Sequence, residues 1–100
     1  MYTRGAAVSE LTMTVKSSDF KISNTMRAVF RCDGESITVQ IICADKAAGS
    51  PMTYTCEEAV ALGNRIIESG SWEEFPVSGI PLDAVKDFGH RLRQYGLHGI

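Results

Sequence analysis

The dipeptide Asp33-Gly34 separates two segments, residues 24–32 and 36–43, in which apolar side chains alternate with polar ones. Asp-Gly is typical of a two-residue β-turn, and this alternation is typical of strands with one buried face. A turn centred on these residues predicts a hairpin in which the opposed pairs on one face are all apolar: Phe30/Ile37, Ala28/Val39 and Met26/Ile41.

The other face of this hairpin is predicted to be mostly polar. It carries the pairs Arg31/Ser36, Val29/Thr38 and Arg27/Gln40. A sheet with one apolar face must cover that face with other elements, whereas its polar face can stay in solvent or meet a partner.

A third strand is predicted over residues 8–16, where Leu11, Met13 and Val15 alternate with Glu10, Thr12 and Thr14. The segment 44–54 has no such period and contains Gly49, Ser50 and Pro51. It is therefore interpreted as a connection that leaves the sheet.

Two helices are predicted in the second half of the chain. Thr55 and Glu58 have the spacing of a capping box, and Gly70 is placed to end the first helix. Pro81 lies in the first turn of the second helix, and Gly96 is a natural stop. The sequence thus predicts one small α+β domain over residues 1–100: a three-stranded antiparallel β-meander followed by two helices packed on one sheet face.

Composition limits the classes of function. Twelve acidic and ten basic residues give a formal charge of −2, which provides no overall electrostatic reason to bind nucleic acid or an anionic membrane. No segment has the ~20 apolar residues of a membrane span, and the first residues lack the apolar core of a secretory signal. Three cysteines without a Cys-x-x-Cys pair favour a reducing, cytoplasmic location.

Cys56 is the one candidate nucleophile, because a thiolate at the start of a helix is stabilised by the helix dipole. Glu57 and Glu58 oppose this effect, and neither His90 nor His98 has a spacing typical of a Cys-His pair. We expect Cys56 to pack as a small apolar residue. A thiol-dependent enzyme or redox protein is the alternative.

No cofactor or metal is expected. Cys32 and Cys43 lie too far apart along the predicted hairpin for a disulfide, and His90 and His98 with scattered cysteines match no common zinc spacing. The common phosphate-binding and hydrolase motifs are missing from the sequence. The protein is therefore predicted not to be an enzyme.

A basic row on the second predicted helix comprises Lys86, His90, Arg91 and Arg93. It could contact phosphate or an acidic protein. Asp83 and Asp87 stand at the spacing of ordinary ion pairs with Lys86 and Arg91, which indicates a solvated helix face. Direct nucleic-acid binding through this row is the weaker alternative function.

The loop GSWEEFPVSG places Trp72 and Phe75 on either side of Glu73 and Glu74. Two interpretations follow: Trp72 closes the end of the core, or it projects as an aromatic anchor with an acidic rim in a protein-binding surface.

The function predicted from these features is a small non-catalytic protein-binding module. It would act as an inhibitor or adaptor on a larger protein or ribonucleoprotein complex, as do the small phage proteins that block bacterial defence complexes such as CRISPR effectors. The residues predicted to contact the partner are Trp72, Glu73, Glu74, Phe75, Arg27, Arg31, Lys86 and Arg93. A homodimer through an open sheet edge or face is compatible with this arrangement.

Overall fold

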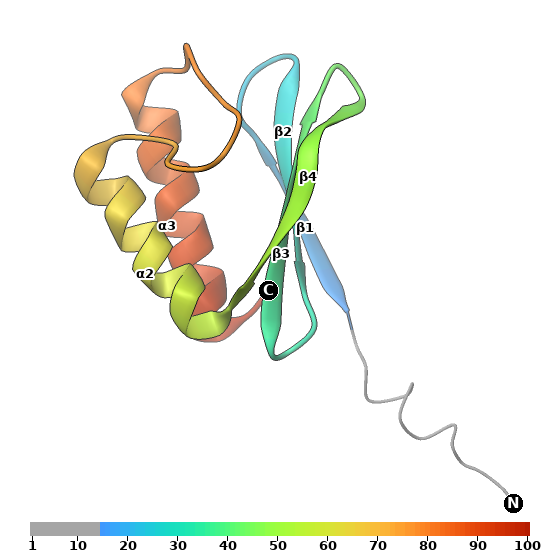
Figure 1. Cartoon of the computed structure of the whole chain (residues 1–100), viewed down its shortest axis with the longest axis vertical. Coiled ribbons are helices and arrows are strands. Elements are labelled where there is room, and N and C mark those ends of the chain that lie inside the picture. The colour runs from blue at the N-terminus through green and yellow to red at the C-terminus, as the bar shows by residue number, and fades with distance from the viewer. Residues whose placement is uncertain (1–14) are drawn as a thin grey trace, which may run out of the picture.

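A computed structural model describes residues 15–100 as an antiparallel sheet followed by two helices. The elements are β1 (Lys16–Lys21), β2 (Met26–Cys32), β3 (Ser36–Cys43), β4 (Lys46–Thr55), α2 (Cys56–Ser69) and α3 (Leu82–His98). Figure 1 shows both helices on the same side of the sheet. The α+β class is confirmed, but the sheet formed by residues 15–100 has four strands in the order β1-β2-β3-β4, not three.

The β2–β3 hairpin has the predicted apolar face but a different register. Phe30 lies opposite Val39, not Ile37, and Ala28 lies opposite Ile41. The two residues at the tip are Gly34 and Glu35, flanked by Asp33 and Ser36. Gly34 has a φ of 96°, which fits the glycine that a II′ hairpin needs at its first central position. Moving the turn one residue along changes every pair but leaves each side chain on its original face.

The first strand of the sheet lies later in the chain than the sequence pattern predicts. β1 begins at Lys16 and pairs Phe20 with Ala28. Residues 8–14 of the predicted strand, including Leu11 and Met13, lie outside the described residues. Because β1 is an edge strand whose one large apolar residue is Phe20, it has little hydrophobic alternation to detect.

The prediction that residues 44–54 leave the sheet was wrong, because they form most of β4. Ala44 and Asp45 both have positive φ, 51° and 67°, as a tight hairpin turn requires. β4 pairs with β3 on both sides of a bulge between Ala48 and Met52. The bulge contains Gly49, Ser50 and Pro51, so it interrupts the alternation by which a strand is recognised.

The start of α2 follows the predicted chemistry, whereas Pro81 lies one residue before α3 and not in its first turn. Thr55 and Glu58 form the capping box, and Gly70 ends α2 in the left-handed conformation with a φ of 68°. The predicted stop at Gly96 was wrong: α3 continues to His98.

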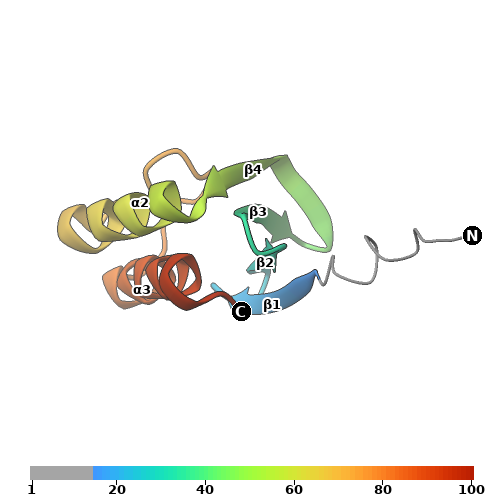
Figure 2. The same ribbon diagram turned by 90° about the horizontal axis from the view of Figure 1, so that it is seen from below.

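The two helices approach each other through glycines. A Cβ added to Gly63 would lie 2.7 Å from the carbonyl oxygen of Gly89, and one added to Gly96 would lie 2.8 Å from the carbonyl oxygen of Cys56. Gly96 therefore serves the contact with α2 rather than the end of α3. Seen from below, α2 lies towards β4 and α3 towards β1 (Figure 2).

Phe88 lies at the centre of the core. Its ring centroid is 5.5 Å from that of Phe30 on β2, 6.1 Å from that of Phe20 on β1, and 5.0 Å from those of both Trp72 and Phe75. One fully buried side chain on α3 thus joins the helix to the sheet and to the loop after α2.

We expect Phe88→Ala to lower the free energy of unfolding by about 3–5 kcal/mol, because it leaves a cavity that several elements share. The matched control is Leu97→Ala on the same helix, where half of the side chain is exposed (50%) and a much smaller loss is expected. Urea denaturation followed by circular dichroism measures both. Equal losses for the two variants would contradict a core centred on Phe88.

Gly63→Ala is also expected to destabilise the protein, by about 1–3 kcal/mol, because the new methyl group would push the two helix backbones apart. Helix propensity alone predicts the opposite sign, a gain of about 1 kcal/mol. Asn64→Ala, at an exposed neighbouring position, is the control and should be close to neutral. Thermal unfolding that shows Gly63→Ala to be stabilising would refute the close helix contact.

Candidate protein-binding surface

The sheet face that points away from the helices is left uncovered by the described residues (Figure 1). Side-chain alternation assigns to it residues from all four strands. We call this surface the open face; its members on β2, β3 and β4 include Arg27, Val29, Arg31, Thr38, Gln40, Ile42, Pro51 and Thr53.

A hollow of about 220 Å³ lies in the middle of the open face. It is lined by three apolar residues, Val29, Ile42 and Pro51, together with Arg31, Thr38 and Gln40. A second hollow of about 220 Å³ lies beside it, lined by Val15, Arg31, Asp33, Ser36 and Thr38. Arg31 and Thr38 line both hollows, so the surface offers two adjoining depressions with a cation between them.

The two arginines of the open face have different surroundings. Arg27 forms an ion pair with Asp19 on β1, with 2.7 Å between Nη1 and Oδ2. Arg31 is exposed and forms no ion pair with any residue of the described range 15–100. Its guanidinium group is therefore available to a carboxylate from outside the described chain.

Hydrogen bonds hold the polar side chains around the central hollow. The hydroxyl groups of Thr38 and Thr53 are 3.0 Å apart across β3 and β4. Gln40 Nε2 donates to the carbonyl oxygens of Gly49 (3.2 Å) and Ile41 (2.9 Å). The bond to Gly49 ties β3 to the bulge of β4, which carries Pro51, so the wall of the hollow is positioned before any partner binds.

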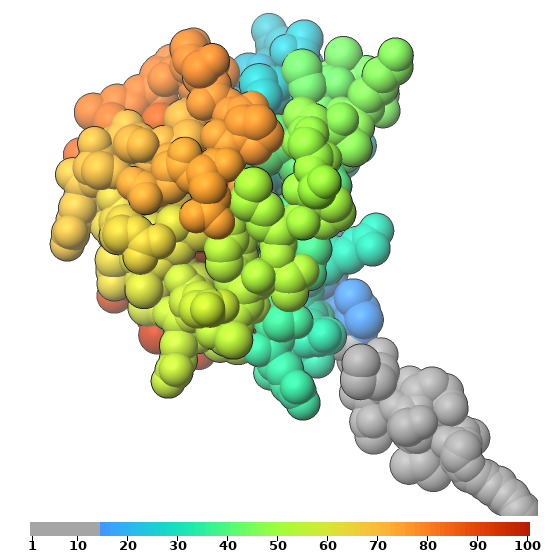
Figure 3. Space-filling view, viewed as in Figure 1, coloured from blue at the N-terminus to red at the C-terminus, as the bar shows by residue number. Residues whose placement is uncertain are grey.

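The loop with Trp72 closes the core, as one of the two sequence interpretations expected. Trp72 and Phe75 are only 7% and 4% exposed, because both pack on Phe88. The alternative in which Trp72 projects as an anchor does not fit this burial. Figure 3 shows the loop, in orange, lying directly against β4, in green.

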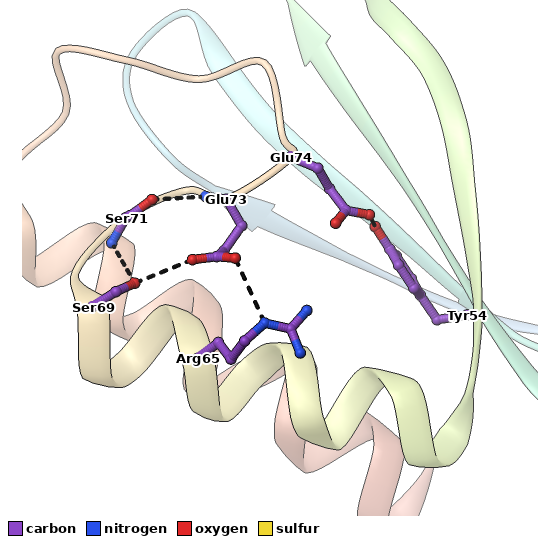
Figure 4. Close-up of polar contacts among 6 residues, drawn as sticks. All are labelled: Tyr54, Arg65, Ser69, Ser71, Glu73 and Glu74. Atoms are coloured by element: carbon purple, nitrogen blue, oxygen red, sulfur yellow. Dashed lines mark hydrogen bonds and ion pairs between the residues drawn. The ribbon is translucent and has the colours of Figure 1, made fainter.

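The two glutamates of this loop bind other parts of the protein. Glu73 forms an ion pair with Arg65, at 3.6 Å between Oε1 and Nε, and accepts from the Ser69 hydroxyl (Figure 4). Glu74 accepts from the hydroxyl of Tyr54 on β4. Burial and the adjacent Glu74 carboxylate raise the pKa of Tyr54, so this phenol stays a donor. These contacts fasten the loop to α2 and to β4.

The predicted basic row lies on α3 and so does not join the open face. Lys86 and Arg93 are exposed there. Arg91 instead lies over the ring of Phe20, at 5.0 Å from its centroid, and donates to the Tyr95 hydroxyl at 3.2 Å. Neither of the two expected ion pairs with Asp83 and Asp87 forms within the described residues. Of the predicted contact residues, the open face brings together only Arg27 and Arg31.

Cys56 is partly buried, and its thiol lies 3.7 Å from the carbonyl oxygen of Glu35. The other cysteines, Cys32 and Cys43, are also free. Within residues 15–100, His, Cys, Asp and Glu side chains form no group of three or more that could hold a metal ion. Over the same residues, neither helix has both the length and the apolar character needed to cross a membrane.

Sequence reasoning missed the apolar residues of the hollow. Pro51 was assigned to a connection, and Val29 was counted with the polar face. The adjacent pair Ile41-Ile42 did carry a signal, because consecutive apolar residues in a strand point to opposite faces and one of them must lie away from the core.

Comparison of the chain with protein-family models, with curated proteins and with solved structures finds no significant match. The function of the chain must therefore be inferred from its own surfaces.

The Asp33 carboxylate fixes the turn beside the second hollow, and it should make folding pH-dependent. It accepts from the backbone N–H groups of Glu35 (3.0 Å) and Ser36 (2.9 Å), which lower its pKa below the usual 3.8. A lowered folded-state pKa gives stability that is fully present above pH 3.8 and is lost as the pH falls through the folded-state value. Asp33→Ala should thus be less stable than wild type at pH 7.

The measurement is urea denaturation of both proteins between pH 2 and pH 7. The stability difference between wild type and Asp33→Ala should shrink as the pH falls below about 4. Glu35→Ala, at the exposed tip of the same turn, is the control. A difference that stays constant down to pH 2 would show that the carboxylate charge does not hold the turn.

Proposed function

We propose that this chain is a small, non-catalytic protein-binding module that acts as an inhibitor or adaptor on a larger protein or ribonucleoprotein complex. The open face is the contact surface. The observation that supports this most is the apolar hollow bordered by Arg31, an exposed cation that has no carboxylate partner among the described residues.

The chemistry of the open face defines the partner. Val29, Ile42 and Pro51 would receive an apolar side chain, and Arg31 would pair with a carboxylate next to it. Arginine beside an apolar pocket is a frequent centre of binding energy in protein interfaces. The partner surface is therefore acidic around an apolar projection.

The distribution of charge supports the same orientation. The open face carries Lys21, Arg27 and Arg31 against Asp19 and Asp33, whereas α2 and the loop after it carry five glutamates against Arg65: Glu57, Glu58, Glu68, Glu73 and Glu74. An acidic partner would be attracted to the open face and repelled by the α2 side. Charge thus favours approach of an acidic partner to the open face over approach to the α2 side.

A small inhibitor of the kind by which phages block bacterial defence complexes is the specific role that we propose, in the cytoplasm of the host cell. A module that only occupies a surface needs neither a cofactor nor a reactive group. The contacts of Cys56 do not support a thiol mechanism. Among the described residues, the thiol contacts the backbone carbonyl oxygen of Glu35 and forms no hydrogen bond with a basic side chain.

The experiment is affinity capture from a lysate of the source cell with three immobilised baits, followed by mass spectrometry. The baits are wild type, Arg31→Glu, and Lys46→Glu as the control on the helix-side face of β4. A complex captured by wild type and by Lys46→Glu should be lost with Arg31→Glu. Removing one partner of a desolvated charge pair lowers the binding free energy by about 2–5 kcal/mol. Arg31→Glu should therefore weaken the affinity at least tenfold.

Circular dichroism of the three baits checks that each is folded. Capture of the same complex by all three folded baits would remove the open face as the contact surface.

A further inference from the structure

The outer edge of β1 is a row of backbone groups that no described residue pairs. Along an antiparallel strand, every second residue directs its N–H and C=O groups to the strand on one side, and the residues between them direct theirs to the strand on the other side. The N–H of Ile22 donates to the Met26 carbonyl at 2.9 Å, which assigns the even-numbered residues of β1 to bonding with β2. The backbone groups of Ser17, Asp19 and Lys21 therefore point outwards.

The opposite edge of the sheet is protected, so β1 is the edge open to pairing. β4 contains the bulge at residues 49–51, and Pro51 has no N–H to donate. The loop after α2 also lies against β4: Glu74 binds Tyr54, and a Cβ on Gly49 would lie 3.5 Å from Pro76. Bulges, proline and covering loops are the usual means by which proteins block an edge strand.

We infer that β1 pairs with β1 of a second copy of this chain, antiparallel and about a two-fold axis at Phe20. Backbone pairing requires outward-pointing residues to meet each other, so odd-numbered residues must lie opposite odd-numbered residues. With the axis at Phe20, Asp19 of each copy lies opposite Lys21 of the other. An axis at Asp19 would instead place two carboxylates face to face, which is unfavourable.

The surface beside β1 also fits a second copy. On the helix side of the strand, a hollow of about 570 Å³ is lined by Phe20, Asp87, His90, Arg91, Gln94 and Tyr95. The axis places Phe20 of the two copies directly opposite, in a pair that does not exchange backbone hydrogen bonds and whose side chains are therefore close. Arg91 already lies over the Phe20 ring of its own copy. The Phe20 ring of the second copy would pack beside this pair.

Such a dimer joins two four-stranded sheets into one of eight strands, with both open faces on the same side. The inference does not depend on the proposed function, because it rests on β1 and α3 alone. If both hold, the dimer offers a partner two copies of the same binding surface.

Sedimentation equilibrium of the full chain, from about 1 µM to about 1 mM, tests the dimer by mass action. The average mass of wild type should rise from 10.9 kDa towards twice that value. In Lys21→Asp, the new carboxylate of each copy lies opposite Asp19 of the other copy, so two pairs of like charges face each other. This should raise the dissociation constant at least tenfold. The exchanged variant Asp19→Lys/Lys21→Asp restores opposite charges and should restore dimerisation.

Two controls separate this effect from changes inside one copy. Arg27→Ala removes the ion pair with Asp19 and should leave the dimer nearly unchanged. Lys21→Pro removes one outward N–H while keeping the bonds to β2, so it should dimerise less than Lys21→Ala. A wild type that stays at monomer mass at all concentrations would overturn the inference, as would an exchanged variant that dimerises no better than Lys21→Asp.

Discussion

The burial of Phe88 between the sheet and the loop after α2 is the interaction on which the other features depend. It contacts β1, β2 and both aromatic residues of that loop. Because these contacts lie on one side of the sheet, they hold both helices there. The opposite side of the sheet is then left to solvent or to a partner. Its chemistry is set by the side chains of the strands that point away from Phe88.

The dimensions of the elements explain why a single pair of helices is sufficient. Four strands at ~4.8 Å spacing are roughly 14 Å across, and two helices packed ~8–10 Å apart cover that width. The glycines at positions 63, 89 and 96 bring the helix backbones into contact. The pair can therefore lie over the sheet without a third helix, and residues 15–100 contain no further element to cover the open face.

Local chemistry made part of this fold predictable from sequence. The faces of β2 and β3 follow from the alternation of Ala28, Phe30, Ile37, Val39 and Ile41 with mostly polar neighbours, and the start of α2 follows from the capping box of Thr55 and Glu58. The exact pairing of the hairpin was not predictable, because Asp33 can either occupy the turn or accept its hydrogen bonds. In the fold it accepts them, and this moves the tip to Gly34 and Glu35.

The missed features have tertiary causes. β4 was missed because its bulge breaks the alternation, and β1 because an edge strand has little apolar surface to bury. Arg27 and Arg31 were correctly placed on one face. The hollow beside Arg31 also needs Pro51 of β4, which lies far from Arg31 in the sequence and is brought close only by the sheet. Gly96 looked like a helix end because a contact between two helices leaves no local pattern.

A nuclear Overhauser spectrum of the labelled protein in solution tests directly whether Phe88 holds both helices on one side of the sheet. The ring protons of Phe88 should show cross-peaks to Phe30, Trp72 and Phe75, while the methyl groups of Val29 and Ile42 should show none to α2 or α3. Cross-peaks from Val29 or Ile42 to either helix would show that the helices do not leave that face open, and would contradict both the fold and the proposed function.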